Sequence, residues 1–159
     1  MNLDLLKIKA KEKEKENRNF LKDPKTKGLI KELAKVHDEV FDEVDCLACA
    51  NCCKTISPRF RTPDVARLAK YLRLKETVFV EQYLRVDEDG DYVVKSSPCP
   101  FLGADNYCSV YDARPNDCRN YPYTDSDVFF KRPNTTLQNT FVCPAANLAV
   151  EKMKKLAKF

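Results

Sequence analysis

The chain has 159 residues, of which 43% are apolar and 33% charged, a balance typical of a soluble globular domain. The net charge is only +4 with both signs interleaved, so a nucleic-acid-binding surface is not expected. No apolar stretch approaches the roughly 18 residues that span a membrane, and lysines interrupt the N-terminus from Lys7 onward. We therefore expect a cytoplasmic protein that binds neither membrane nor nucleic acid.

The first 45 residues contain no cysteine, and eleven basic side chains balance eleven acidic ones. The Lys/Glu run predicts a solvated helix from Leu3 to about Leu21, ended by Asp23-Pro24. A second helix is expected to place one apolar face inward, made of Leu29, Leu33, Val36, Val40 and Val44. We take residues 1–45 as an N-terminal helical segment and residues 46–159 as a cysteine-cluster metal-binding domain, with the two forming one compact unit.

Two further helices and a hairpin are predicted next. Thr62-Pro63 opens a third helix, with Thr as its N-cap and a buried stripe of Val65, Leu68, Ala69 and Leu72. Val78, Phe79 and Tyr83 indicate a fourth helix. Residues 85–95 form a hairpin around Asp89-Gly90, with Tyr92-Val93-Val94 as the return strand.

The C-terminal part alternates short elements with irregular chain. Residues 107–111 suggest a short strand, and Pro115 starts a short helix that carries Cys118. Residues 122–142 are rich in Thr, Asn and Asp and are expected to be irregular. Cys143-Pro144 opens a last helix whose inward side chains are Ala145, Ala149, Met153 and Leu156. The predicted fold class is a small, mainly α domain with a minor β-hairpin (α+β), stabilised by metal.

Eight cysteines form the most specific pattern in the chain. Four of them lie within eight residues, spaced C-x2-C-x2-C-C, and the others are distant, which gives the set Cys46, Cys49, Cys52, Cys53, Cys99, Cys108, Cys118 and Cys143. In a reducing compartment such clusters are more often metal sites than disulfides. The eight thiols are therefore the candidate metal ligands.

The spacing also predicts how the ligands group. Cys46, Cys49 and Cys52 can converge on one centre with one cysteine from the second region. Cys53 is expected to face elsewhere, because neighbouring side chains diverge in most backbone conformations. Cys53 and three later cysteines would then complete a second four-sulfur site. A single centre with several structural cysteines also stays open.

The all-cysteine donor set suits both zinc and iron, including an iron–sulfur cluster, and does not decide between them. Cys118 and Cys143 lie at predicted helix starts, where amides and the helix dipole favour a thiolate. His37, the only histidine, is not needed as a ligand.

Two arginines lie close in sequence to the cysteines. Arg114 and Arg119 are expected to support the negative charge of bound thiolates. They could instead contact an anion such as phosphate or carboxylate, and Arg114 could cap carbonyls around the Pro115 turn.

Several segments together resemble a known family. They are the knuckle Cys46-x2-Cys49-x2-Cys52-Cys53, the element Cys99-Pro-Phe-Leu102, and the segment from Cys108 through Arg114-Pro115-x2-Cys118-Arg119 to Pro122. The chain resembles the CxxCxxCC cysteine-cluster proteins, zinc- or iron-chelating domains, over about residues 44–145, and it looks like a short, stand-alone, bacterial-type member. The family knuckle often has Gly where this chain has Asn51, and Asn tolerates the left-handed backbone that the turn requires.

The resemblance implies that the eight cysteines are the metal-binding set, with no settled reaction. A similar cysteine domain occurs in flagellin lysine methylases, where it implies an iron–sulfur centre and methyl transfer to lysine. We therefore expect a metal-binding protein of unknown physiological role, with a metal ion and an unidentified protein as partners. The alternatives are an iron–sulfur redox protein and a methyl-transfer enzyme, so whether the chain is an enzyme stays open.

Overall fold

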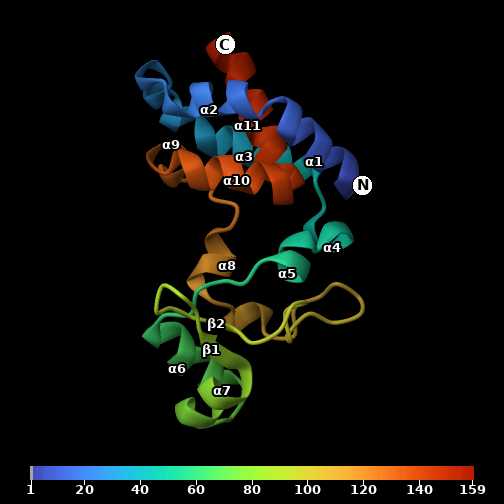
Figure 1. Ribbon diagram of the computed structural model, residues 1–159, viewed down its shortest axis with the longest axis vertical. Coiled ribbons are helices and arrows are strands. Elements are labelled where there is room, and N and C mark those ends of the chain that lie inside the picture. Colours follow the sequence, from blue (N-terminus) through green and yellow to red (C-terminus); the bar gives the residue numbers. More distant parts are fainter. Residues whose placement is uncertain (1) are drawn as a thin grey trace. The chain divides into compact units, whose positions relative to one another are not determined.

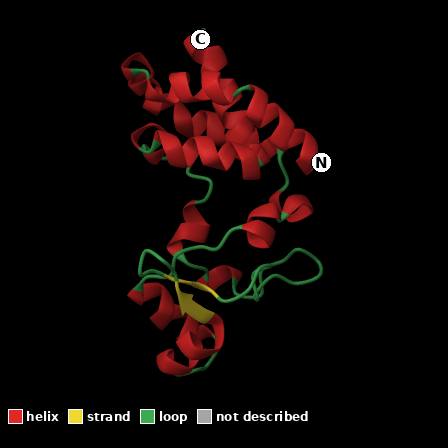
Figure 2. Ribbon diagram, viewed as in Figure 1, coloured by secondary structure: helices red, strands yellow, loops and turns green. Residues whose placement is uncertain are grey.

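Helices dominate the chain, and one small antiparallel sheet is the only sheet among residues 2–159, which the computed structural model describes (Figures 1 and 2). The predicted fold class is therefore confirmed. The elements in chain order are α1 (Leu3–Glu12), α2 (Glu14–Lys22), the 3-10 helix η1 (Pro24–Glu32), α3 (Leu33–Glu43), α4 (Cys46–Cys49), α5 (Asn51–Thr55), α6 (Thr62–Tyr71), α7 (Glu76–Tyr83), β1 (Leu84–Val86), β2 (Tyr92–Val94), the 3-10 helix η2 (Tyr111–Ala113), α8 (Asn116–Asn120), α9 (Val128–Lys131), α10 (Pro133–Val142) and α11 (Pro144–Ala157). Within residues 2–159, no helix has the length and apolar character that crossing a membrane requires.

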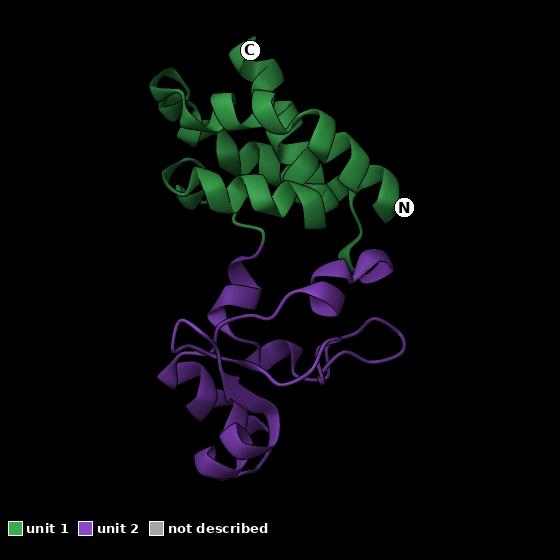
Figure 3. Cartoon of the chain, viewed as in Figure 1, with its two compact units in different colours: residues 1–46, 122–159 green, residues 47–121 purple. Residues whose placement is uncertain are grey.

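The chain divides into two compact units (Figure 3). Unit 1 combines Met1–Cys46 with Pro122–Phe159, and unit 2 is the continuous segment Leu47–Tyr121. These units do not coincide with the predicted division into residues 1–45 and 46–159. The predicted division into residues 1–45 and 46–159 stays a prediction.

Unit 1 is a helical bundle in which α10 packs against α1, α2 and α11, while α11 also packs against α3 (Figure 1). Its centre contains the fully buried side chains of Phe20, Val36, Val40 and Met153. The predicted first helix is divided at Lys13 into α1 and α2, and it is solvated on one side only, because Phe20 is fully buried.

The expectation that residues 122–142 are irregular is wrong. Pro133 opens the ten-residue helix α10, in which Thr136 and Thr140 are buried. The Thr136 hydroxyl donates to the Phe129 carbonyl at 2.8 Å, and the Thr140 hydroxyl donates to the Leu137 carbonyl at 2.7 Å. Packing with satisfied hydroxyls therefore overrides the low helix propensity of Thr and Asn.

The last helix begins at Pro144, as predicted, and Ala145, Ala149 and Met153 are buried. Leu156 was expected to face inward but is 51% exposed. Lys154 is buried instead, and its ammonium is held by Glu16 at 2.6 Å and by Glu151 at 2.7 Å. A buried cation is tolerated here because two carboxylates neutralise it.

Unit 2 is built on the predicted third and fourth helices and the hairpin. In α6 the side chains of Val65, Leu68 and Ala69 are buried, while Phe79 of α7 is fully buried beside Phe101. The hairpin has the predicted strands, paired Leu84 with Val94 through Val86 with Tyr92. Gly90 has φ +83° at its turn, a conformation that suits glycine.

The segment around Cys108 forms no strand. Residues 107–111 were expected to be extended, but only an isolated bridge joins Leu102 to Cys108, and the chain then enters η2. This bridge brings Cys108 next to the Cys99-Pro-Phe-Leu102 element. The short helix α8 carries Cys118, as predicted.

Candidate metal centre

The first cysteine cluster is folded as two short helices. Cys46 and Cys49 are the ends of α4, while Cys52 and Cys53 lie in α5. The two helices are joined at Ala50, which has the left-handed φ of 46°. The left-handed residue was expected at Asn51, but the structure places it one residue earlier, at Ala50. Asn51 is buried and opens α5.

The thiols of Cys52 and Cys53 lie side by side. Their Sγ atoms are 4.0 Å apart, so the expectation that these side chains diverge is wrong. Two sulfurs on one tetrahedral zinc, each at about 2.3 Å from the metal, are separated by about 3.8 Å. The observed distance therefore suits both two adjoining centres and one shared ion.

Cys53 belongs to a group of four half-buried thiols in unit 2, completed by Cys99, Cys108 and Cys118. The backbone N–H of Cys99 donates to the Cys53 carbonyl at 2.8 Å, which joins α5 directly to the Cys99 element. All three later thiols lie close enough to Cys53 for its negative charge to raise their pKa values. We call this set the Cys53 group.

The four thiols differ in acidity. A hydrogen bond with the Cys52 thiol and, less strongly, the Lys54 ammonium lower the pKa of Cys53 to about 7. Burial raises the pKa of Cys99 to about 11, and it also raises the pKa of Cys108. Without metal, Cys53 therefore carries most of the negative charge of the group at neutral pH, while the others hold their protons.

Backbone amides point at two of these sulfurs. The N–H groups of Phe101 and Leu102 donate to Cys99, and the N–H of Val110 donates to Cys108, in each case lowering the pKa of the thiol. Amide donors of this kind stabilise thiolates bound to zinc or iron. The chain around these two cysteines therefore fits a metal-bound thiolate.

Cys118 is the least acidic member of the group. It lies in the first turn of α8, where a helix terminus was expected to favour the thiolate. Burial and the negative charges of Cys53, Cys99 and Cys108 instead raise its pKa to about 12. Burial and nearby negative charge raise the pKa of Cys118 more than the terminus of a five-residue helix can lower it. At neutral pH, only a bound cation would therefore keep Cys118 as a thiolate.

The two predicted arginines act on the loop that precedes Cys118. The Arg114 guanidinium donates to the Tyr111 carbonyl at 2.7 Å and lies 3.7 Å from the centre of the Tyr111 ring. The Arg119 guanidinium donates to the carbonyls of Asp112 at 2.6 Å and Arg114 at 3.3 Å. Arg114 also lowers the pKa of Cys108 by its charge. These contacts are carbonyl caps, one of the roles expected for Arg114.

Replacing Arg114 by alanine is expected to destabilise the fold and to weaken metal retention together. The change removes a hydrogen bond and a cation–π contact, worth about 1 kcal/mol each at a partly exposed site. It also withdraws the positive charge that favours the Cys108 thiolate. Thermal unfolding and metal content after dialysis measure the two effects.

Arg114→Lys, which keeps the charge without the planar fork, should preserve metal better than alanine does. Full metal content and stability in Arg114→Ala would contradict this role.

Comparison with known families adds an independent observation. The model of the CxxCxxCC family, described as "Putative zinc- or iron-chelating domain", matches residues 45–144. The chain belongs to the CxxCxxCC family. No curated protein and no solved structure matched the chain. The matched range contains all eight cysteines, so the cysteine cluster is the part of the chain that defines the family.

The CxxCxxCC cysteines are divided between the two units. Cys46 and Cys143 belong to unit 1, and the other six belong to unit 2. In residues 2–159 no three His, Cys, Asp or Glu side chains already converge as a coordination sphere. The thiols of the Cys53 group are near enough to shift one another's pKa values. Because they do not yet face a common point, they must turn toward one another to bind a single ion.

The lone histidine has another partner. His37 Nδ1 lies 2.8 Å from the Thr124 hydroxyl, and the imidazole packs on the Phe41 ring at 4.6 Å between centres. Both contacts are within unit 1, which supports a structural role for His37.

Two residues that contact the chain just before Cys118 of this CxxCxxCC protein were missed in the sequence. Asp64 and Arg67 of α6 bind the backbone on both sides of Pro115, just before Cys118. The signal available was local, since Asp at the third helical position suggests an N-terminal capping interaction. The partners are 46 to 52 residues away in sequence, and no pattern indicates them.

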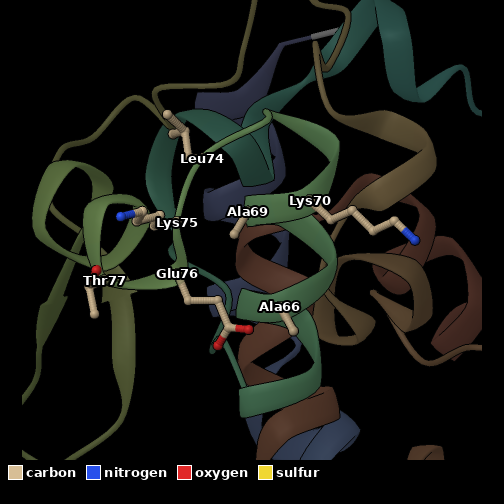
Figure 4. Close-up of a pocket in the computed structure, with 7 residues that line it drawn as sticks. All are labelled: Ala66, Ala69, Lys70, Leu74, Lys75, Glu76 and Thr77. Atoms are coloured by element: carbon tan, nitrogen blue, oxygen red, sulfur yellow. The ribbon is translucent and has the colours of Figure 1, made fainter.

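A hollow between α6 and the start of α7 is not part of the cysteine site. A cavity of about 440 Å³ in unit 2 is lined by Ala66, Ala69 and Lys70 of α6 and by residues 74–77 (Figure 4). Figure 4 shows the ammonium groups of Lys70 and Lys75 pointing away from each other and from the Glu76 carboxylate. A ligand site needs convergent polar groups, so this cavity does not suggest one.

Proposed function

We propose that this CxxCxxCC protein binds zinc or iron through its cysteine thiolates, and that the Cys53 group holds one metal centre. The observation that carries the proposal is the proximity of four half-buried thiols in unit 2, where amide N–H groups already point at two of them. Zinc and iron–sulfur centres both use four thiolate ligands. When bound, the metal would supply the positive charge that these half-buried thiolates need.

A second group is proposed from the spacing of the other cysteines. Cys46, Cys49 and Cys52 are three residues apart, and such spacing lets sulfurs face a common centre. The fourth ligand of this group was expected from the second cysteine region, and its identity stays a prediction. Because Cys52 and Cys53 are neighbours with sulfurs 4.0 Å apart, the alternative is that both bind the same ion. Two separate centres and one shared ion predict different metal counts in cysteine variants, so substitution experiments distinguish the two arrangements.

The remaining functional expectations rest on fewer observations. An iron–sulfur redox role requires that the bound metal be iron, and methyl transfer rests on the resemblance to flagellin lysine methylases alone. The cytoplasmic location, the protein partner and the absence of nucleic-acid binding remain predictions from composition. Arg114 and Arg119 are proposed as support for the site, because their guanidinium groups hold the loop before Cys118 and the charge of Arg114 acts on Cys108.

Metal analysis of the anaerobically purified protein tests the proposal. We expect one or two equivalents of metal, with a colourless protein for zinc and a brown one for an iron–sulfur cluster. Removing the metal with a chelator should lower the melting temperature and the helical circular dichroism signal. At a thousandfold excess of free metal over its Kd, the stabilisation lost is about 4 kcal/mol. Purified protein without metal, with melting unaffected by chelator or added zinc, would refute the proposal.

A further inference from the structure

A buried carboxylate in α6 joins its own helix to the start of α8. Asp64 is 1% exposed, and its oxygens accept hydrogen bonds from the Arg61 N–H at 3.0 Å and the Asn116 N–H at 3.1 Å. The Arg67 guanidinium donates to the same carboxylate at 2.6 Å. A buried charge is costly unless it is paired and hydrogen-bonded, and all of these contacts are made within unit 2.

Arg67 extends the contact to the other side of Pro115. Its Nε donates to the Ala113 carbonyl at 3.1 Å, and its terminal nitrogen donates to the Arg114 carbonyl at 2.9 Å. Together, Asp64 and Arg67 therefore bind two carbonyls before Pro115 and one amide after it. The fork geometry of a guanidinium makes such multiple contacts directional.

The backbone that they hold leads directly to Cys118. Asn116 is the first residue of α8, and Cys118 is two residues further on. This helix has only five residues, and so short a helix does not keep its own position without tertiary contacts. The direction of the Cys118 thiol therefore depends on what anchors the start of α8.

The other members of the Cys53 group are anchored differently. The N–H of Cys99 donates to the Cys53 carbonyl at 2.8 Å, and Ser109 next to Cys108 donates its N–H to the Phe101 carbonyl at 2.8 Å. Neither contact involves α6. Loss of the α6 anchor should consequently affect Cys118 more than Cys99 or Cys108.

We propose that Asp64 and Arg67 form a positioning pair that holds the start of α8, so that the Cys118 thiol can join Cys53, Cys99 and Cys108 on a metal. This inference rests on the proposed function of the Cys53 group. It assigns to α6 a task that no cysteine spacing indicates, namely the orientation of one metal ligand.

Residue-resolved alkylation tests the pair on the full chain. Protein purified anaerobically with its metal is exposed to iodoacetamide, and the modification of each cysteine is followed by mass spectrometry. Loss of an outer-shell partner typically costs about 10- to 100-fold in metal affinity, and a thiol must leave the metal before it is alkylated. In Asp64→Asn, alkylation of Cys118 should therefore become faster relative to Cys99, by up to about that factor. Asp87→Asn is the matched control, because Asp87 also accepts two backbone N–H bonds, from Asp89 at 3.0 Å and Asp91 at 2.9 Å, in the same unit. It should leave the ratio unchanged.

Arg67→Lys provides a second variant if Asp64→Asn does not fold. It keeps the positive charge beside Asp64 but cannot bind both carbonyls, so a smaller shift of the same sign is expected. Faster alkylation of Cys99, Cys108 and Cys118 in parallel, or no change in either variant, would overturn the positioning role and leave the proposed function intact. Wild-type protein that lacks metal and protects none of its cysteines would overturn the proposed function, and the positioning role with it.

Discussion

Replacing Cys118 by serine is expected to remove one whole metal equivalent from the protein. A hydroxyl is a poor ligand for zinc or iron in an all-thiolate site, and the remaining thiols of the Cys53 group cannot complete four-sulfur coordination. Metal content measured after gel filtration gives the count directly. If Cys49 belongs to a separate centre, Cys49→Ser should remove a different equivalent.

Double variants supply the control for this grouping. Substitutions within one centre should be non-additive, whereas substitutions in two centres should add. Cys118→Ser combined with Cys53→Ser should therefore lose no more metal than Cys118→Ser alone. Cys118→Ser combined with Cys49→Ser should lose all of it. If Cys52→Ser and Cys53→Ser each abolish the same equivalent as Cys118→Ser, the adjacent thiols share one ion and the two-centre arrangement is wrong.

Metal affinity is expected to rise steeply with pH, because protons and metal compete for the same sulfurs. The pKa values of Cys99, about 11, and Cys118, about 12, lie above the usual value, as does that of Cys108, so these three thiols are protonated at neutral pH. Cys53, with a pKa of about 7, adds a fourth proton only in more acidic solution. The apparent affinity should change by about three to four powers of ten per pH unit, the higher value applying at lower pH.

Competition for zinc against a chromophoric chelator, between about pH 6 and 8, measures this slope. The chelator's own protonation must be corrected for at each pH. In Cys118→Ser the slope should fall by about one power of ten per pH unit, because one titrating ligand has been removed. A slope of one or less in the wild-type protein would mean that the thiols are ionised before metal arrives, contrary to their burial.

Elements governed by local chemistry were predicted well from the sequence. Asp89-Gly90 indicated the hairpin because its turn requires a left-handed residue, and Gly90 has φ +83°. The spacing of Val65, Leu68 and Ala69 identified the buried face of α6, because helical periodicity reports burial directly. The third helix begins within a residue of the predicted start, with Arg61 as its N-cap in place of Thr62.

Tertiary contacts explain what was missed. The helix α10 contains Thr and Asn residues that favour loops, and it forms because Thr136 and Thr140 satisfy their hydroxyls inside the bundle. At the site, cysteine spacing indicated the candidate ligands but could not show that Cys52 and Cys53 bring their sulfurs to 4.0 Å. The bond from Asn116 to Asp64 spans 52 residues and carries no sequence signature.

The division of the chain into units has a consequence for folding during synthesis. Unit 2 is continuous, so all of its residues are available once Tyr121 has left the ribosome. Unit 1 needs α10 and α11, which are synthesised after unit 2, to cover the early helices α1, α2 and α3. Translation proceeds at about 5 to 20 residues per second, so residues 122–159 follow unit 2 over a few seconds. During that interval every cysteine of the Cys53 group has been synthesised, while the apolar side chains of α1, α2 and α3 still lack α10 and α11.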